Sequence, residues 1–393
     1  MNKMKKVCIA LFVLALLIAL THFETTQSQI VTYPFTMPYK NFVLEVLHYN
    51  GSLATYNGIK YINLSMAVGS LPMGIIYDNN RNVVWIALLP EYSNPNNIYG
   101  IAKVNVSDYS IAIYRFPWYV DDDYYGPAPW TIAIDSNGEL WVTIRSYCVT
   151  PNHPPSTIPY LAKLNTNNNT LTIFWIPTYL AGGCDIKFHK GFIWYMTNNG
   201  LSQINYTTCT IIESWLIPFY GGFMKEDGGY LWLTSISNNF VTRFNISSKQ
   251  FDLNLRGFDR PLGIEVDEKY VYVAENSWNV GANGTIAKID KANPSQISRI
   301  TTLKITNEGP YGVLKDSSGN LWWTDNSYHV GVLLVNGTMM IWESKPYCYF
   351  MVEVPESSIW FICKGSAYVG IVSIPLFSTP IGGGLGGGRK TLY

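Results

Sequence analysis

The chain carries few charged residues for its length. Asp, Glu, Lys and Arg make up 14% of its 393 residues, whereas soluble domains average about 25%. Positive and negative side chains balance, so the formal net charge is zero. Bulk charge therefore attracts neither nucleic acid nor an anionic membrane surface. We expect no nucleic-acid partner.

Familiar catalytic motifs are also missing. The sequence has five histidines and contains no Gly-x-Ser-x-Gly and no P-loop. His189 falls in an expected tight turn and His153 in a proline-rich loop, so neither is well placed as a general base. The sequence therefore shows no serine or cysteine nucleophile with a nearby histidine base.

Long apolar runs are absent except near the start. Lys3, Lys5 and Lys6 precede an apolar run over residues 7–20, and polar residues follow it. This is the shape of a secretory signal peptide, and the run is shorter than the roughly 20 residues of a spanning helix. We predict a signal peptide over residues 1–28 and a secreted or cell-surface protein. Only an uncleaved signal segment would attach it to a membrane.

Cysteine is scarce, with six residues in the chain and five beyond the predicted signal. An odd number in a secreted protein leaves one thiol free or intermolecular. Cys348 and Cys363 lie on neighbouring predicted strands of one repeat and can form a disulfide; Cys184 with Cys209 is the alternative. The spacings match no zinc site.

What the sequence does contain is a repeat. Residues 129–143 read PWTIAIDSNGELWVT, which predicts a strand, a tight turn and a second strand. Related stretches begin at residues 72, 261 and 310, with weaker copies from residues 182, 221 and 346. The aromatic residue of the second strand falls at Trp85, Trp141, Trp194, Trp232, Tyr272, Trp322 and Trp360.

The spacing of these aromatic residues, about 40 to 55 residues, is typical of a propeller or a solenoid. A third and a fourth strand follow most pairs, so each copy predicts a four-stranded antiparallel blade. The fold class is therefore all-β, a seven-bladed β-propeller over residues 70–375. Residues 29–69 are predicted to supply N-terminal strands, at least one of which closes the ring as the outer strand of the last blade. The Gly-rich residues 376–393 predict a flexible tail.

This topology predicts two different faces. Tight turns between strands one and two, and between strands three and four, share what we call the turn face. The longer connections, from strand two to three and from blade to blade, form the loop face, where binding sites are usually built. Aromatic residues there are candidates for stacking against a sugar or an aromatic ligand: Trp118, Trp130, Tyr179, Tyr220, Trp278, Tyr311 and Tyr328.

Polar residues next to the first and second strands are expected around the channel mouth on the loop face. Carboxylates and amides that converge there can hold Mg²⁺ or Ca²⁺ through oxygen ligands, with Glu275 and Asp325 as the candidates. The candidate ligand-binding residues are Arg145, Asp185, Asn198, Asn276, Asn326, Trp130 and Tyr311.

Eight Asn-x-Ser/Thr sequons predict glycosylation. The acceptors are Asn50, Asn63, Asn105, Asn168, Asn205, Asn245, Asn283 and Asn336. Five of these, Asn105, Asn168, Asn205, Asn245 and Asn336, fall between predicted strands three and four. We therefore predict a glycosylated turn face and an uncovered loop face.

The repeat P-x-G-I-x-x-D-x-x-G-x-L-W-x-T-(D/E)-N, followed by I-A-K-(I/L/V)-(N/D), resembles the streptogramin B lyase (virginiamycin B lyase) family of seven-bladed propellers. NHL-repeat and SMP-30/gluconolactonase propellers are more distantly similar. The lyase family opens a lactone ester by Mg-assisted elimination, using a Glu-x-His pair after a second strand. The matching positions here read Glu275-Asn276-Ser277 and Asp325-Asn326-Ser327, with His329 two residues further on. The resemblance implies Glu275, Asp325 and His329 as catalytic candidates.

Two functions remain open at this point. The first is a secreted or surface propeller that binds a small molecule, a glycan or a surface protein on its loop face. The second is a metal-dependent lyase or lactonase acting through Glu275, Asp325 and His329.

Overall fold

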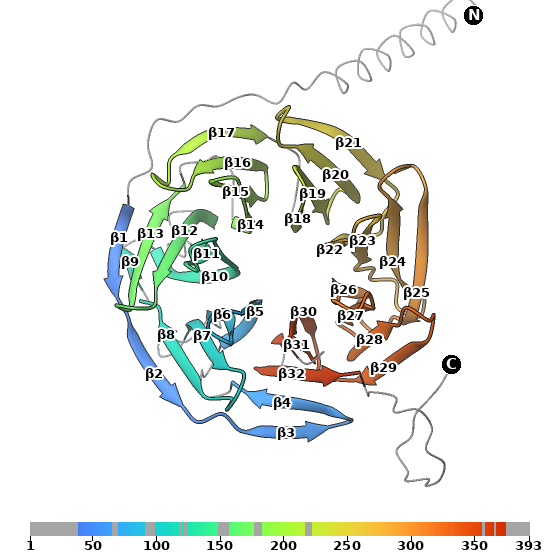
Figure 1. The fold of residues 1–393 in the computed structure, drawn as a ribbon, viewed down its shortest axis with the longest axis horizontal. Helices are drawn as coiled ribbons and strands as arrows, with labels where there is room; N and C mark the ends of the chain where they lie inside the picture. The colour runs from blue at the N-terminus through green and yellow to red at the C-terminus, as the bar shows by residue number, and fades with distance from the viewer. Residues whose placement is uncertain are drawn as a thin grey trace, which may run out of the picture.

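The computed structural model describes residues 38–64, 70–90, 99–117, 119–121, 124–147, 157–176, 183–216, 222–355, 358–364 and 367–374. Within these ranges the chain forms thirty-two strands in seven sheets arranged around a central axis (Figure 1). The predicted seven-bladed β-propeller is confirmed. The described residues contain no helix long and apolar enough to span a membrane.

Blades 1 to 4 follow the chain order predicted from the repeat. Blade 1 contains β5 (Ser70–Asp78), β6 (Val83–Pro90), β7 (Gly100–Asn105) and β8 (Ile111–Arg115). Blade 2 contains β10 (Tyr124–Ile134), β11 (Leu140–Tyr147), β12 (Thr157–Asn165) and β13 (Thr170–Trp175), with β9 (Tyr119–Asp121) beside β10. Blade 3 contains β14 (Gly183–His189), β15 (Phe192–Thr197), β16 (Gly200–Asn205) and β17 (Ile211–Leu216). Blade 4 contains β18 (Met224–Asp227), β19 (Tyr230–Ser235), β20 (Phe240–Asn245) and β21 (Gln250–Arg256).

Blades 5 to 7 complete the ring. Blade 5 contains β22 (Pro261–Val266), β23 (Tyr270–Glu275), β24 (Asn283–Asp290) and β25 (Ile297–Lys304). Blade 6 contains β26 (Pro310–Lys315), β27 (Leu321–Asp325), β28 (His329–Leu333) and β29 (Met339–Glu343). Blade 7 contains β30 (Cys348–Val354), β31 (Ser358–Cys363) and β32 (Tyr368–Ser373).

N-terminal strands close the ring, as predicted. The outer edge of blade 7 is β4 (Ile59–Asn63), which pairs with β32, and β3 (Leu53–Tyr56) lies outside β4. The chain goes further than we predicted, because β2 (Glu45–Tyr49) and β1 (Pro38–Val43) add outer strands to blades 1 and 2. The N-terminal segment therefore covers the outer edges of three consecutive blades (Figure 1).

The aspartate of the repeat holds the tight turn against the aromatic residue of strand two. Trp141 and Trp322 donate their indole N–H to Asp135 and Asp316, each at 2.8 Å. Equivalent contacts link Asp78 with Trp85, Asp227 with Trp232 and Asp267 with Tyr272. Blades 3 and 7 place His189 and Val354 at the aspartate position, which is why their copies of the motif look weak.

Burial alone would raise the pKa of Asp267. Backbone N–H groups of Tyr270 and Lys269, with the amine of Lys315, outweigh that effect and lower this pKa to about 2. The carboxylate is thus charged at neutral pH and acts as a strong acceptor within the turn.

Two further residues of the repeat join neighbouring blades. Thr234, in the W-x-T part of blade 4, accepts the N–H of Phe223 at 2.9 Å and donates to the carbonyl of Leu262 in blade 5 at 2.8 Å. The glycine of P-x-G lies where the next blade approaches closely. A Cβ on Gly263 would stand 2.4 Å from the carbonyl oxygen of Tyr311, so no other residue fits without a shift of the backbone.

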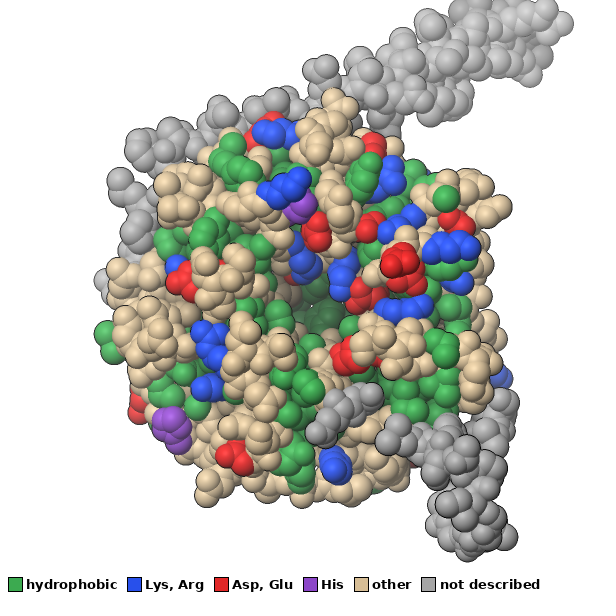
Figure 2. All heavy atoms as spheres, viewed as in Figure 1, with side chains coloured by type: hydrophobic (Ala, Val, Ile, Leu, Met, Phe, Trp, Pro, Cys, Tyr) green, Lys and Arg blue, Asp and Glu red, His purple; other side chains and the backbone are tan. Residues whose placement is uncertain are grey.

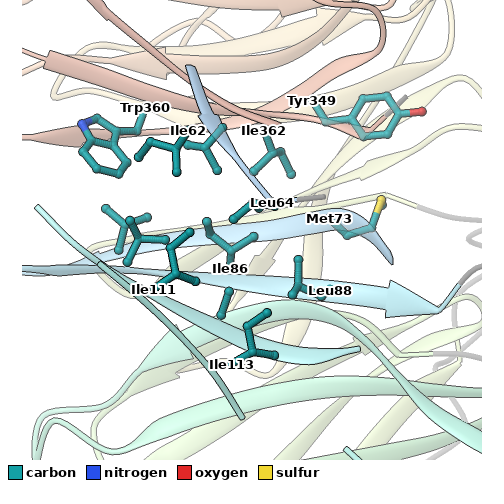
Figure 3. Close-up of a cluster of buried hydrophobic side chains, with 14 of the residues drawn as sticks. Ile62, Leu64, Met73, Ile86, Leu88, Ile111, Ile113, Tyr349, Trp360 and Ile362 are labelled. Atoms are coloured by element: carbon teal, nitrogen blue, oxygen red, sulfur yellow. The ribbon is translucent and has the colours of Figure 1, made fainter. Parts of the chain in front are cut away.

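The apolar core lies between the blades. In the cluster between blades 7 and 1, Trp360 and Ile362 face Ile86 and Ile113 (Figure 3). The strand-two tryptophans at positions 85, 141, 194, 232, 322 and 360 are each at most 1% exposed. They therefore occupy equivalent buried places around the ring, as predicted.

We expect Thr234→Val to destabilise the protein. Valine has nearly the same shape but leaves the N–H of Phe223 and the carbonyl of Leu262 unpaired in a buried position. The expected loss is about 1–3 kcal/mol of unfolding free energy, measured by chemical denaturation. Thr301→Val on the exposed side of β25 is the control and should change stability by less than about 0.5 kcal/mol. Equal effects of the two substitutions would contradict the bridging role.

Candidate functional site

Glu275 is a buried carboxylate that pairs with a partly exposed arginine. It ends β23 and is 1% exposed. Its Oε2 accepts from the guanidinium of Arg299 at 2.8 Å and from the hydroxyl of Thr285 at 2.7 Å. Its Oε1 accepts from Arg299 at 3.0 Å and from the backbone N–H of Asp259 at 3.1 Å. Both oxygens of this predicted metal ligand are thus used inside blade 5 and its entry loop.

Asp325 and His329 do come together. The Nδ1 of His329 lies 3.2 Å from Oδ2 of Asp325, while Oδ1 accepts the backbone N–H groups of His329 and Ser327. Burial alone would lower the pKa of His329, but the hydrogen bond and charge of Asp325, with the charge of Glu343, raise it. The pair therefore acts as an ion pair over a wider pH range than an isolated histidine would allow.

Glu275 does not form a three-residue metal site with Asp325 and His329 in this structure. Among the described residues, no group of three or more His, Cys, Asp and Glu side chains is arranged to hold a metal ion. Glu275 contacts Arg299, Thr285 and Asp259, whereas Asp325 contacts Ser327 and His329.

The other predicted ligand-binding residues have mostly structural partners. Asp185 accepts from the amine of Lys187 and, across the blade boundary, from the N–H of Met224.

The predicted asparagines also have partners. Asn198 accepts a hydrogen bond from the thiol of Cys184, and Asn276 donates to the carbonyl of Gly309. For Arg145 the structure describes backbone pairing with Ala128 and Pro159. Trp130 packs against the core between blades 7 and 1.

A group of side chains that the sequence did not single out together lies on the loop face, where blades 5 and 6 meet. Trp278, in the connection from β23 to β24, donates its indole N–H to Oε1 of Glu308 at 2.8 Å. Asn326, just after β27, donates its amide to the other oxygen of Glu308. The guanidinium carbon of Arg260, just before β22, lies 3.2 Å from the centre of the Trp278 ring. We call these four residues the Trp278 cluster.

An aromatic layer borders the cluster. Tyr311 on β26 stacks on Tyr349 of β30, with ring centres 4.0 Å apart. Burial raises the pKa of Tyr349 to about 12, and the charge of Glu308 adds to that effect. Asn326 and Tyr311, both predicted ligand-binding residues, thus lie at one site, whereas Arg260 and Glu308 were missed. Their only sequence signal is that they lie one and two residues before first strands.

The five turn-face sequons share one local geometry. Asn105, Asn168, Asn205, Asn245 and Asn336 lie at the end of strand three or in the turn that follows it, as predicted. In each, the side-chain carbonyl accepts the backbone N–H of the Ser or Thr two residues later, at 2.8–3.2 Å. Of the other three, Asn50 lies between β2 and β3, Asn63 ends β4 and Asn283 begins β24.

Cys348 and Cys363 face each other in register between β30 and β31. Both are buried thiols with sulfurs 3.1 Å apart, a placement consistent with the predicted disulfide, which stays a prediction. Cys184 and Cys209 belong to separate core clusters. Burial raises the pKa of the Cys209 thiol to about 12. Cys148 lies outside the described residues.

No protein-family model and no curated protein matches this sequence. Solved structures match in fold. A chain of the mitotic checkpoint complex has TM-score 0.59 and 11% identity, over 80% of this chain and 90% of that one. The extracellular domain of the putative hybrid two-component system BT4673 from B. thetaiotaomicron has TM-score 0.59 and 14% identity, over 82% of this chain and 43% of that one. BamB from Moraxella catarrhalis has TM-score 0.51 and 10% identity, over 86% and 99%.

Identities this low show the fold alone. The matches support a β-propeller and do not establish membership of the streptogramin B lyase family.

The His329–Asp325 pair predicts a pH dependence of stability. Because the pKa of His329 is raised in the folded protein, the pair stabilises it fully below the ordinary histidine pKa of about 6.5. That contribution is lost as the pH rises through the folded-state pKa. NMR titration of the His329 imidazole should give a pKa above the value of about 6.5 for an isolated histidine. In Asp325→Asn this pKa should fall. Glu343→Gln, which removes the more distant charge, should produce a smaller shift. A wild-type pKa at or below the ordinary value would refute the ion pair.

Proposed function

We propose that this protein is a secreted or cell-surface propeller that binds a glycan or a glycosylated partner at the Trp278 cluster on its loop face. The observation that carries the proposal is the combination, at one place, of an exposed fixed indole and buried polar atoms without partners. The structural neighbours are compatible with this setting, since one is described as an extracellular domain and another belongs to a multi-protein complex.

Trp278 differs from the tryptophans of the core. It is 62% exposed, whereas the strand-two tryptophans are almost fully buried. Glu308 holds its indole N–H and Arg260 covers one of its faces. An aromatic ring that is exposed yet held in one orientation is a suitable surface for stacking against a sugar ring, and such residues often dominate binding energy.

The polar atoms beside Trp278 favour a hydroxylated ligand. Within the part of the chain that the structure describes, Oδ1 of Asn326 and one terminal nitrogen of Arg260 are buried and have no hydrogen-bond partner. One is an acceptor and the other a donor, and Glu308 interacts with both side chains. Buried polar atoms without partners are costly, which favours a group that satisfies them. Once a shift of these side chains exposes the two atoms, a sugar hydroxyl can donate to the first and accept from the second.

The lyase or lactonase alternative would require Glu275 to act on a metal or a substrate. The contacts of Glu275 with Arg299, Thr285 and Asp259 leave it as a structural acceptor in the arrangement described above. No observation on the described residues favours that alternative specifically.

Trp278→Ala should weaken recognition of sugars by the protein. We expect the mature protein to bind a defined subset of oligosaccharides on a glycan array, and the alanine variant to lose up to about tenfold in signal, since one stacked ring contributes about 0.5–1.5 kcal/mol. Tyr56→Ala removes an aromatic side chain on β3 that is 46% exposed, and serves as the control. The proposal fails if no oligosaccharide binds, or if both substitutions weaken binding equally.

We also propose that the turn face carries N-linked glycans. The five sequons in the turns from strand three to strand four are ordered alike and lie on the face opposite the Trp278 cluster. Glycopeptide mass spectrometry of protein from its native host should find occupied sites among Asn105, Asn168, Asn205, Asn245 and Asn336. Unmodified peptides at all five would remove this part of the proposal, without bearing on the Trp278 cluster.

A further inference from the structure

The central channel holds a cavity separate from the Trp278 cluster. All seven innermost strands, β5, β10, β14, β18, β22, β26 and β30, line it, and its volume is about 510 Å³. That volume is in the range of small-molecule sites. Figure 2 shows the hollow at the axis of the disc, with Lys, Arg, Asp and Glu side chains gathered on one side of it.

An aromatic contact closes the channel toward the loop face. Phe223 of blade 4 and Phe350 of blade 7 meet across the axis, with ring centres 4.5 Å apart. The equivalent positions in blades 1, 5 and 6 are Gly74, Gly263 and Gly312, which carry no side chain toward the axis. Tyr311 packs edge-on against Phe350 at 5.4 Å and widens this aromatic floor.

The next layer of the channel wall is divided into two halves. It consists of the first-strand residue that pairs with the strand-two aromatic residue in each blade. Blades 3, 4 and 5 place charged side chains there: Lys187, Lys225 and Glu265. The other four blades place apolar side chains there: Leu314, Val352, Ile76 and Ala133.

The charged half presents amines to the cavity. Lys187 pairs with Asp185 at 2.8 Å, and Lys225 pairs with Glu265 at 2.6 Å. The lysine side chains are 28% and 38% exposed, whereas the two carboxylates are 7% and 8% exposed. The acids therefore lie behind the amines. Glu226, nearer the tight turn, is itself paired with His189.

We propose that this cavity binds a small amphipathic organic anion. Its carboxylate or sulfonate would contact the amines of Lys187 and Lys225, and its hydrocarbon part would lie against Leu314, Val352 and Ile76. An inorganic anion would leave the apolar half without a partner, and an organic cation would meet amines rather than the buried acids. The inference is independent of sugar binding at the Trp278 cluster.

Calorimetric titration of the full mature protein with decanoate tests the proposal. Decanoate has one carboxylate and a single apolar chain, so we expect one bound molecule per protein. Two matched probes define specificity: decyltrimethylammonium keeps the chain and reverses the charge, and acetate keeps the carboxylate without the chain. Both should bind at least tenfold more weakly than decanoate.

Two variants locate the binding site. Lys187→Met and Lys225→Met should each weaken decanoate binding by about tenfold, the effect of losing one charged hydrogen bond. The acids left behind keep backbone partners, Met224 for Asp185 and Val266 for Glu265, so both variants should fold. Lys249→Met removes an amine paired with Glu213 away from the channel and should bind decanoate normally.

Absence of decanoate binding, or equal binding of the cationic probe, would overturn the proposal. Unchanged affinity in both channel variants would do so as well. Trp278→Ala should leave decanoate binding intact. Failure of the anion-binding proposal can therefore be told apart from failure of the sugar-binding proposal.

Discussion

The fold depends on one hydrogen bond that is repeated around the ring, from a strand-two aromatic residue to the aspartate that ends strand one. In five blades this carboxylate accepts an indole or phenol proton, and in four of them it also accepts backbone N–H groups of the tight turn. Each contact ties the innermost strand to a buried ring that packs against the neighbouring blade. A hydrogen bond to a charged acceptor contributes more than a neutral hydrogen bond. The turn, the strand pair and the packing between blades are thereby stabilised together.

This constraint explains why the fold could be predicted from the sequence. The aspartate, the aromatic residue, the threonine and the glycine each have a fixed physical role, so they recur at constant offsets and the copies can be aligned. The repeat does not determine where the N-terminal strands β1 and β2 pair. They join blades 1 and 2 through backbone hydrogen bonds at outer edges, where exposed side chains need no particular pattern. Strands were predicted over residues 29–69, but only the ring-closing one was given a place, because the last blade lacked a strand.

The candidate sites could be predicted only in part, for a related reason. Glu275 was selected because it follows a second strand, but its partner Arg299 lies on β25 and nothing near Glu275 in the sequence indicates that pairing. The Trp278 cluster combines residues from two connections within blades and two entries to first strands. Their proximity follows from the closed ring and from the loop conformations. Asn326 and Tyr311 were found because they flank strands; Arg260 and Glu308 lie in connections whose shape the repeat does not determine.

Functional information therefore lies where the copies differ. The glycine position becomes phenylalanine in blades 4 and 7, and the two rings close the channel. The apolar position of strand one becomes lysine or glutamate in three consecutive blades, which makes one half of the cavity polar. Neither change strengthens the ring, since a paired charge at a partly buried position contributes little to stability. The same aromatic layer, with Tyr311 touching both Tyr349 and Phe350, borders the Trp278 cluster on one side and the cavity on the other. The packing of these rings therefore forms a wall that the two sites share.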